Sequence, residues 1–104
     1  MELDGFTFDS QKEARRYTEL KLLVRVGEIS ELELQKSFVL AESVKFNNEP
    51  RAKPDIRYVA DFTYIENGVM IVEDVKSKAT KSLPVYRMKK HLMMSVHGIE
   101  IQEI

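Results

Sequence analysis

The chain has 104 residues, of which 43% are hydrophobic and 32% are charged. This length predicts a single domain over 1–104 with its own core, and the composition excludes a disordered or collagen-like chain. Because there is no cysteine, disulfide scaffolds, thiol nucleophiles and cysteine-ligated zinc are excluded, and two histidines disfavour a multi-histidine metal site. The sequence shows no signal peptide and no apolar run of membrane length, so we expect a cytoplasmic protein without a membrane partner.

Charge is unevenly distributed, although the net charge is only −1. Residues 1–74 carry 10 basic and 15 acidic side chains, whereas residues 75–97 carry 6 basic side chains and no acidic one. A basic segment beside an acidic body can bind a polyanion locally. An ordinary solvated helix face would give the same pattern, so charge alone leaves both interpretations open.

The first predicted element is a helix that begins after Ser10 and ends at Gly27. Ser10 is a good N-cap, and a glutamate follows three residues later, as in a capping box. Partial alternation predicts a strand over 29–40, and two Asn and two Pro residues predict a loop over 45–55. Helical spacing places four residues on the core-facing stripe of the first helix: Glu13, Tyr17, Leu20 and Val24.

Two strands, 57–66 and 69–76, follow and are joined by an Asn-Gly turn at 67–68. Asn-Gly between such runs is the strongest short-range signal for a hairpin. A two-residue turn sets a register in which paired residue numbers sum to 135, so Asp61 should face Asp74.

The remaining pattern predicts a basic loop over 77–82, a helix from about Leu83 to Gly98, and a last strand over 99–104. The predicted core positions of this helix are Val85, Met88, Leu92 and Val96. The element order α-β-β-β-α-β predicts an α/β (α+β) fold with a small mixed sheet and helices packed on it.

The predicted pairing of Asp61 with Asp74 is energetically unfavourable. Two unit charges about 5 Å apart repel by roughly 3 kcal/mol at an effective dielectric constant of about 20. A shared proton, the ammonium of Lys76 on the same face, or a divalent cation could relieve the repulsion. Oxygen-only ligands favour Mg²⁺ or Mn²⁺. Glu13 should also point toward the sheet, although it could simply complete the capping box of Ser10.

These residues resemble the PD-(D/E)xK nuclease superfamily, through Asp61, the Asp-Val-Lys run at 74–76, the helix glutamate and the element order. The segments DSQKEARRYTELKLL, GEISELELQ, YVADF, ENGVMIVEDVK and YRMKKHLM resemble more closely a family of small uncharacterised phage-encoded proteins, grouped as a branch of these nucleases. The resemblance covers nearly the whole chain. It implies a restriction-endonuclease-like αβββαβ core.

The resemblance also implies a role for each residue of the site. Asp61 and Asp74 would bind the metal, with the backbone carbonyl of Val75, and Glu13 would be a direct or water-mediated ligand. Lys76 would orient the attacking water and stabilise charge on the phosphate. The metal would be Mg²⁺ or Mn²⁺. Gln35 resembles a glutamine that recurs near the site of related nucleases, although it could be an ordinary exposed strand residue.

One departure from the superfamily pattern concerns the Pro-Asp pair, which is Ala-Asp at 60–61. A literal Pro-Asp lies upstream at 54–55, but Asp55 falls at the boundary of loop and strand, so we favour Asp61. Glu73 precedes Asp74, but strand alternation should send it to the opposite face with Phe62.

The basic segment would then contact DNA. The candidate contacts are Lys78, Lys81, Tyr86, Arg87, Lys89 and Lys90; Tyr86 could instead simply pack in the core. His91 and His97 are expected on the helix surface. The methionines at 88, 93 and 94 are expected in the core or in a dimer contact.

We therefore expect a Mg²⁺-dependent DNA endonuclease that acts on branched DNA such as Holliday junctions in phage recombination or replication, as a possible homodimer. The branched substrate rests on what the family implies, and the short chain favours recognition of DNA shape over sequence. One alternative is a catalytically silent DNA-binding accessory protein with a nuclease-like fold. Another is a structural phage protein whose carboxylates are incidental.

Overall fold

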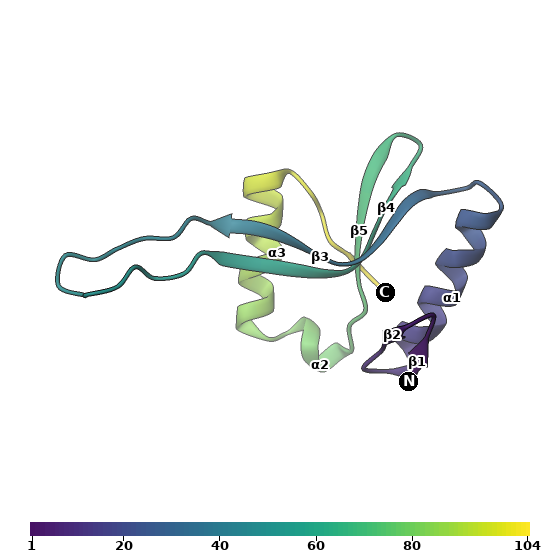
Figure 1. Ribbon diagram of the computed structural model, residues 1–104, viewed down its shortest axis with the longest axis horizontal. Coiled ribbons are helices and arrows are strands. Elements are labelled where there is room, and N and C mark those ends of the chain that lie inside the picture. The colour runs from purple at the N-terminus through teal and green to yellow at the C-terminus, as the bar shows by residue number, and fades with distance from the viewer.

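The computed structural model describes residues 1–104 and contains nine helices and strands (Figure 1). In chain order they are β1 (Glu2–Leu3), β2 (Phe6–Thr7), α1 (Gln11–Arg25), β3 (Ser30–Ala41), β4 (Ile56–Glu66), β5 (Val69–Asp74), α2 (Lys78–Lys81), α3 (Pro84–His97) and β6 (Gln102–Glu103). They form a single compact α+β domain, and the order α1-β3-β4-β5-α3-β6 within it confirms the predicted order. The small hairpin of β1 and β2 was not predicted.

The main sheet has the strand order β3-β4-β5-β6, and it is mixed because only β6 runs parallel to its neighbour. The β4–β5 register confirms the prediction, since Phe62 pairs with Glu73 and Glu66 with Val69. At the turn, Asn67 and Gly68 have φ of 51° and 78°. Positive φ at both central residues is the geometry that Asn-Gly supplies in a tight hairpin.

Two helices cover different parts of this sheet (Figure 1). Helix α1 packs on a core cluster made of Phe8, Ala14, Tyr17, Leu20, Ile29, Phe62 and Tyr64. Helix α3 packs on a second cluster, made of Phe38, Leu40, Tyr58, Ala60, Val72, Tyr86, Met93 and Ile101. The sheet therefore has two separate cores, one under each helix.

At Asp61, the buried side chains of the paired strands β3 and β4 stop packing against α3 and begin to pack against α1. Ala60 packs in the cluster under α3, whereas Phe62, two residues later, packs in the cluster under α1. In a regular strand, side chains two residues apart point to the same face of the sheet, so both would be expected to pack in the same cluster. Gln35, which the register places opposite Asp61, has φ of 56°, so the backbone departs from regular strand geometry there. Val59, two residues before Asp61, is 47% exposed.

Beyond α3, β3 and β4 continue as a long arm that protrudes from the body (Figure 1). Ala41 pairs with Ile56 at its base, and an isolated bridge joins Val44 to Lys53 farther out. The predicted loop over 45–55 is thus confirmed as the end of an arm. The arm accounts for the elongated shape of the molecule, 55 × 30 × 27 Å.

Three details of the C-terminal part differ from the prediction. The predicted loop over 77–82 contains the short helix α2, which Ser77 and Thr80 cap reciprocally. The last strand has two residues instead of six. Helix α3 ends at Gly98 as predicted, with a left-handed C-cap, but its predicted core stripe is wrong: Val85, Met88 and Val96 are exposed and Leu92 is half-buried.

Tyr86 and Met93 supply the buried face of α3 instead. They lie seven residues apart, on a stripe next to the predicted one, so the error is a rotation of the helix about its axis. In α1, Glu13, Tyr17 and Leu20 are buried as predicted, but Val24 is exposed. No helix of the structure has the length and apolar character needed to cross a bilayer.

Candidate functional site

Asp61 and Asp74 come together where β4 and β5 separate. Both residues line one cavity, and the register of the two strands pairs their neighbours Phe62 and Glu73. Oδ2 of Asp61 accepts a hydrogen bond from the backbone N–H of Val75 at 2.8 Å, and Oδ1 lies 3.4 Å from the amide nitrogen of Gln35. Asp74 is almost completely buried, at 3% exposure, whereas Asp61 is partly open to solvent. The structure therefore contains the predicted pair of aspartates, one buried and one accessible.

Two further groups contact the Asp74 carboxylate. The hydroxyl of Tyr58 donates a hydrogen bond to Oδ2 at 2.7 Å, and the ammonium of Lys76 lies 3.4 Å from the same oxygen. The Lys76 ammonium also lies over the ring of Tyr86, 4.4 Å from its centroid, which is a cation–π contact. Lys76 is therefore held between a carboxylate and an aromatic face.

The C-terminal segment fixes the end of β5 that carries this site. The carbonyl of Asp74 accepts a hydrogen bond from the N–H of Ile104, and the N–H of Lys76 donates to the carbonyl of Ile104. The Tyr86 hydroxyl donates to Glu103 at 2.6 Å. Tyr86 is buried and its ring lies beneath the Lys76 ammonium, so the structure shows the packing role that the sequence left open. Its contact with DNA stays a prediction.

Burial and neighbouring charge raise the pKa of both buried acids. For Asp74, removal from water and the nearby Asp61 raise the pKa well above its usual range, while the Tyr58 hydroxyl and Lys76 partly oppose this. For Glu13, burial raises the pKa to about 7, with further increases from the charges of Asp61 and Asp9. The three acids of the site thus have too little positive charge nearby to balance them, as the predicted pairing of Asp61 with Asp74 indicated.

Glu13 is placed at the edge of this cluster by the N-terminus of α1. The Ser10 side chain accepts a hydrogen bond from the Glu13 N–H at 3.1 Å, which is one half of a capping box. The Glu13 carboxylate is buried at 9% exposure, and the charge of Asp61 helps to raise the pKa of Glu13. However, no group of three or more His, Cys, Asp or Glu side chains in the structure is placed to hold a metal ion. Joint ligation by Glu13, Asp61 and Asp74 is therefore not seen in this conformation.

The donor set at the site fits a divalent cation through two carboxylates. Mg²⁺ is commonly held by one or two carboxylates, while water and substrate phosphate complete its octahedral shell. Asp61 and Asp74 supply such a pair, and the carbonyl of Val75 lies next to them in the chain. Their roles as ligands stay a prediction.

Sequence reasoning missed two residues that contact the site. Tyr58 lies three residues before Asp61, so regular alternation would send it to the opposite face; only the change of face at Asp61 brings it to Asp74. Lys12 donates from its ammonium to the carbonyl of Lys76 at 3.2 Å. Lys12 is the neighbour of Glu13 in the first turn of α1, and this position could have indicated that it lies near the site.

A cavity of about 370 Å³ opens onto the two aspartates. Its lining combines the polar site with an apolar wall, and it is formed by Tyr58, Val59, Asp61, Asp74, Lys76, Leu83, Val85, Tyr86 and Lys89. Of the predicted DNA contacts, only Lys89 lines this cavity with the carboxylates, apart from the buried Tyr86.

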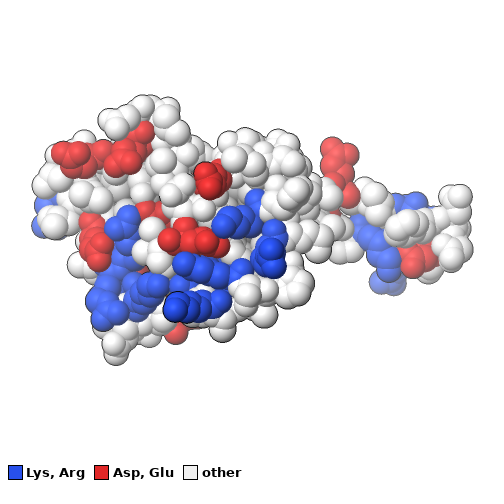
Figure 2. Space-filling view, turned by 180° about the vertical axis from the view of Figure 1, so that it is seen from behind, with Lys and Arg blue, Asp and Glu red and all other residues white.

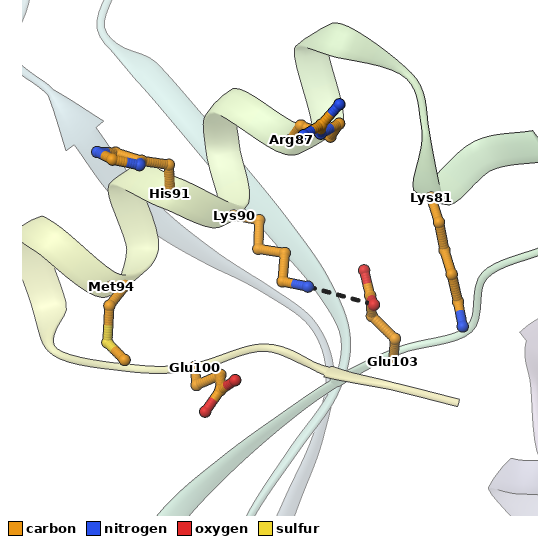
Figure 3. Close-up of a pocket in the computed structure, with 7 residues that line it drawn as sticks. All are labelled: Lys81, Arg87, Lys90, His91, Met94, Glu100 and Glu103. Carbon is orange, nitrogen blue, oxygen red and sulfur yellow. Dashed lines mark ion pairs between the residues drawn. The ribbon is translucent and has the colours of Figure 1, made fainter. Parts of the chain in front are cut away.

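The other predicted DNA contacts lie farther along α2 and α3. Lys81, Arg87 and Lys90 line a second cavity of about 410 Å³ together with His91, Met94, Glu100 and Glu103 (Figure 3). Lys90 is paired with Glu103 at 3.2 Å, whereas Lys78, Lys81 and Arg87 are exposed and form no ion pair in the structure. In Figure 2, Lys and Arg side chains gather over the lower part of the body with acidic side chains among them. The basic residues therefore form a surface of mixed charge beside the site.

The acids that sequence reasoning set aside lie elsewhere. Glu73 faces α1, where Arg16 binds both of its carboxylate oxygens and the Tyr64 hydroxyl donates to it. Asp55 is bound by Arg57 at the start of β4. His91 and His97 are exposed as predicted, and Nε2 of His97 lies 2.7 Å from the carbonyl oxygen of Val39.

Comparison with known proteins gives one match. Residues 1–102 match the family model described as "Protein of unknown function (DUF1064)". No curated protein and no solved structure matches the chain.

Proposed function

We propose, for a chain that belongs to the DUF1064 family of proteins of unknown function, that it is an endonuclease that hydrolyses phosphodiester bonds in DNA with a divalent cation, Mg²⁺ or Mn²⁺. The observation that carries the proposal is that Asp61, Asp74 and Lys76 line one cavity, with the Lys76 ammonium 3.4 Å from the Asp74 carboxylate. Two acids and one ammonium in a surface cavity are poorly explained by stability, because their charges do not balance.

We also propose that the fold is a restriction-endonuclease-like core and that the chain is a branch of the PD-(D/E)xK nucleases. The support is the order α1-β3-β4-β5-α3-β6, together with the two aspartates on the central strands β4 and β5 and the lysine two residues after the end of β5. The arm and the β1–β2 hairpin are additions to that core.

Each residue of the site then has a definite task. Asp61 and Asp74 supply the oxygen ligands, and Glu13 contributes through a water molecule. The cation, when bound, supplies positive charge beside the scissile phosphate and lowers the pKa of water. Lys76 orients the attacking water and stabilises charge on the phosphate; Tyr86 and Asp74 hold its ammonium in place.

The DNA would lie over the exposed basic residues next to the cavity. Lys78, Lys81, Arg87 and Lys89 can neutralise backbone phosphates without reading bases. This favours recognition of DNA shape, and we propose branched DNA such as four-way junctions as the substrate. A homodimer would present two such sites to two strands.

Cleavage assays test the proposal. Four-way junction, flap, single-stranded and linear duplex DNA are incubated with the protein, with and without Mg²⁺. We expect Mg²⁺-dependent cleavage by the wild type, a loss of at least about a hundredfold in Asp74→Asn and Lys76→Met, and no loss in Glu66→Gln, a matched change at an exposed acid of the same hairpin. If the wild type cuts none of these substrates, the proposal fails.

One observation favours a second function, that of a catalytically silent DNA-binding protein. The three carboxylates of the site do not form a three-ligand set in this structure. That function predicts DNA binding by the wild type and by Asp74→Asn with equal affinity, and no cleavage by either.

A further inference from the structure

The arm formed by β3 and β4 carries a group of residues that the proposed active site does not use. Near its end lies Phe46, whose side chain is 53% exposed. It stands in the connection between Ala41 and Ile56, beyond the Val44–Lys53 bridge, and neither core cluster includes it. Figure 1 shows this connection protruding from the body. An aromatic ring that is open to solvent on a protruding element is able to stack on a nucleic-acid base.

Cations and amides surround this ring in the sequence. Lys45 precedes Phe46, two asparagines follow it at 47 and 48, and Arg51 comes after Pro50; all of them are exposed. Lys53 pairs with Glu49 and Arg57 with Asp55, whereas Lys45 and Arg51 form no ion pair in the structure. Basic side chains of the arm are visible at the right of Figure 2. An exposed ring between two unpaired cations is complementary to a polyanion that carries stacking bases.

The arm and the aspartate pair are parts of one structural element. Asp61 lies in β4 opposite Gln35 of β3, and both strands run on from this point into the arm. At the rise of an extended strand, the eleven residue steps from Gln35 to Phe46 span at most about 35–37 Å. This length is close to one turn of B-form duplex, about 34–36 Å. DNA bound at the site and lying along the arm would meet its tip about one helical turn away.

We propose that the arm tip is a wedge that recognises branched or kinked duplex DNA. Phe46 stacks into an opened base step, while Lys45 and Arg51 bind the phosphates on either side. The proposal rests on the proposed function, because it takes DNA to be the substrate of the aspartate site. A continuous duplex must be unstacked to admit the ring, whereas a four-way junction offers steps that open at lower cost.

Binding assays on the full chain test the wedge. Affinity for a four-way junction and for a linear duplex of the same sequence is measured in EDTA, so that cleavage does not interfere. We expect Phe46→Ala to weaken junction binding about tenfold and duplex binding much less, and Phe46→Trp to retain both. Lys45→Ala and Arg51→Ala should weaken binding to the junction and to the duplex alike. Each should also lower the dependence of affinity on salt concentration by the amount expected for about one lost phosphate contact. Val69→Ala, an exposed apolar residue at the far end of the hairpin, is the control and should change nothing.

The outcomes separate the wedge from the nuclease. If Phe46→Ala loses the junction preference while the wild type never cleaves DNA, the wedge stands and the proposed activity falls. Equal junction affinity in Phe46→Ala and wild type overturns the wedge, whether or not cleavage occurs. The wedge is also overturned if the wild type binds no DNA, or if Phe46→Ala converts a dimer into a monomer with unchanged DNA affinity, which would mark the arm as a contact with a second copy.

Discussion

The carboxylate of Asp61 accepts a hydrogen bond from the backbone N–H of Val75, 2.8 Å away, and so joins β4 to the end of β5 just past their last paired residues. The other oxygen of Asp61 faces the amide of Gln35 from β3. Three strand segments therefore orient one carboxylate beside Asp74. The orientation does not depend on a bound cation, so the site is preorganised for one.

The raised pKa of Glu13 predicts that the protein loses stability as the pH rises. In the unfolded chain this carboxyl ionises near 4.5, but in the folded protein only near pH 7. The folded state therefore holds the extra proton between these values, and its stability falls across this range as the pH increases. We expect Glu13→Gln to be as stable as wild type at pH 4 and about 1–2 kcal/mol more stable at pH 8, allowing for partial solvent screening.

Urea unfolding of the two proteins at pH 4, 6 and 8 measures this difference. Glu19→Gln, at an exposed acid of the same helix, serves as the control and should show no such pH-dependent gain. A constant difference between Glu13→Gln and wild type at all three pH values would contradict the electrostatic account of the site.

Mg²⁺ should stabilise the folded protein through the aspartate pair. A ligand that binds only the folded state, at ten times its dissociation constant, adds about 1.4 kcal/mol. For a domain of this size that corresponds to a rise in Tm of about 5–10 °C. The rise should be absent in Asp61→Asn and Asp74→Asn, as measured by calorimetry. If Asp74→Asn retains it, the cation binds elsewhere; if the wild type shows none, the carboxylates are incidental.

Tyr58→Phe should change the pH dependence of cleavage. The Tyr58 hydroxyl donates to the ionised form of Asp74 and so lowers its pKa. Without this bond the pKa of Asp74 rises further, and the acid limb of the pH–rate profile should move to higher pH, with recovery of the rate in alkaline buffer. Tyr64→Phe is the matched control, because its hydroxyl donates to Glu73 on the other face. Coincident profiles for Tyr58→Phe and wild type would show that this bond does not tune the site.

Glu73→Gln should affect stability and leave the chemistry intact. Glu73 is buried and bound through both oxygens by Arg16, so the change leaves the Arg16 guanidinium without its anionic partner. We expect a loss of about 2–4 kcal/mol in the free energy of unfolding. Cleavage per folded molecule should match wild type. A variant that is stable but inactive would place Glu73, and not Asp74, in the active site.

Much of the site could be predicted from the sequence because its geometry follows from one turn. The Asn-Gly turn fixes the register of β4 and β5, and that register brings Asp61 to Asp74 and turns Glu73 away. The capped helix start likewise places Glu13 on the buried side of α1. Local rules suffice here because each contact depends on a single short-range signal.

The remaining features depend on tertiary packing, which short-range patterns do not encode. The contact of Tyr58 with Asp74 requires the strands to change face at Asp61, and a left-handed Gln35 in a strand has no sequence signature. The aliphatic residues of α3 predict the wrong buried stripe. Tyr86 is buried instead, because its hydroxyl donates a hydrogen bond to Glu103, a contact between distant parts of the chain. The sequence predicts only an ordinary loop where the arm lies, because the strand residues that pair at the start of the arm are outside the Pro- and Asn-rich stretch.

The proposed nuclease activity depends on Asp61 and Asp74 sharing one divalent cation. Anomalous scattering from a crystal of the protein soaked in Mn²⁺ tests this most directly, with an Asp74→Asn crystal as reference. We predict one peak within ligating distance of both carboxylates in the wild type and none at that place in the variant. A wild-type map without a peak between these two side chains, at saturating Mn²⁺, would contradict the proposed active site.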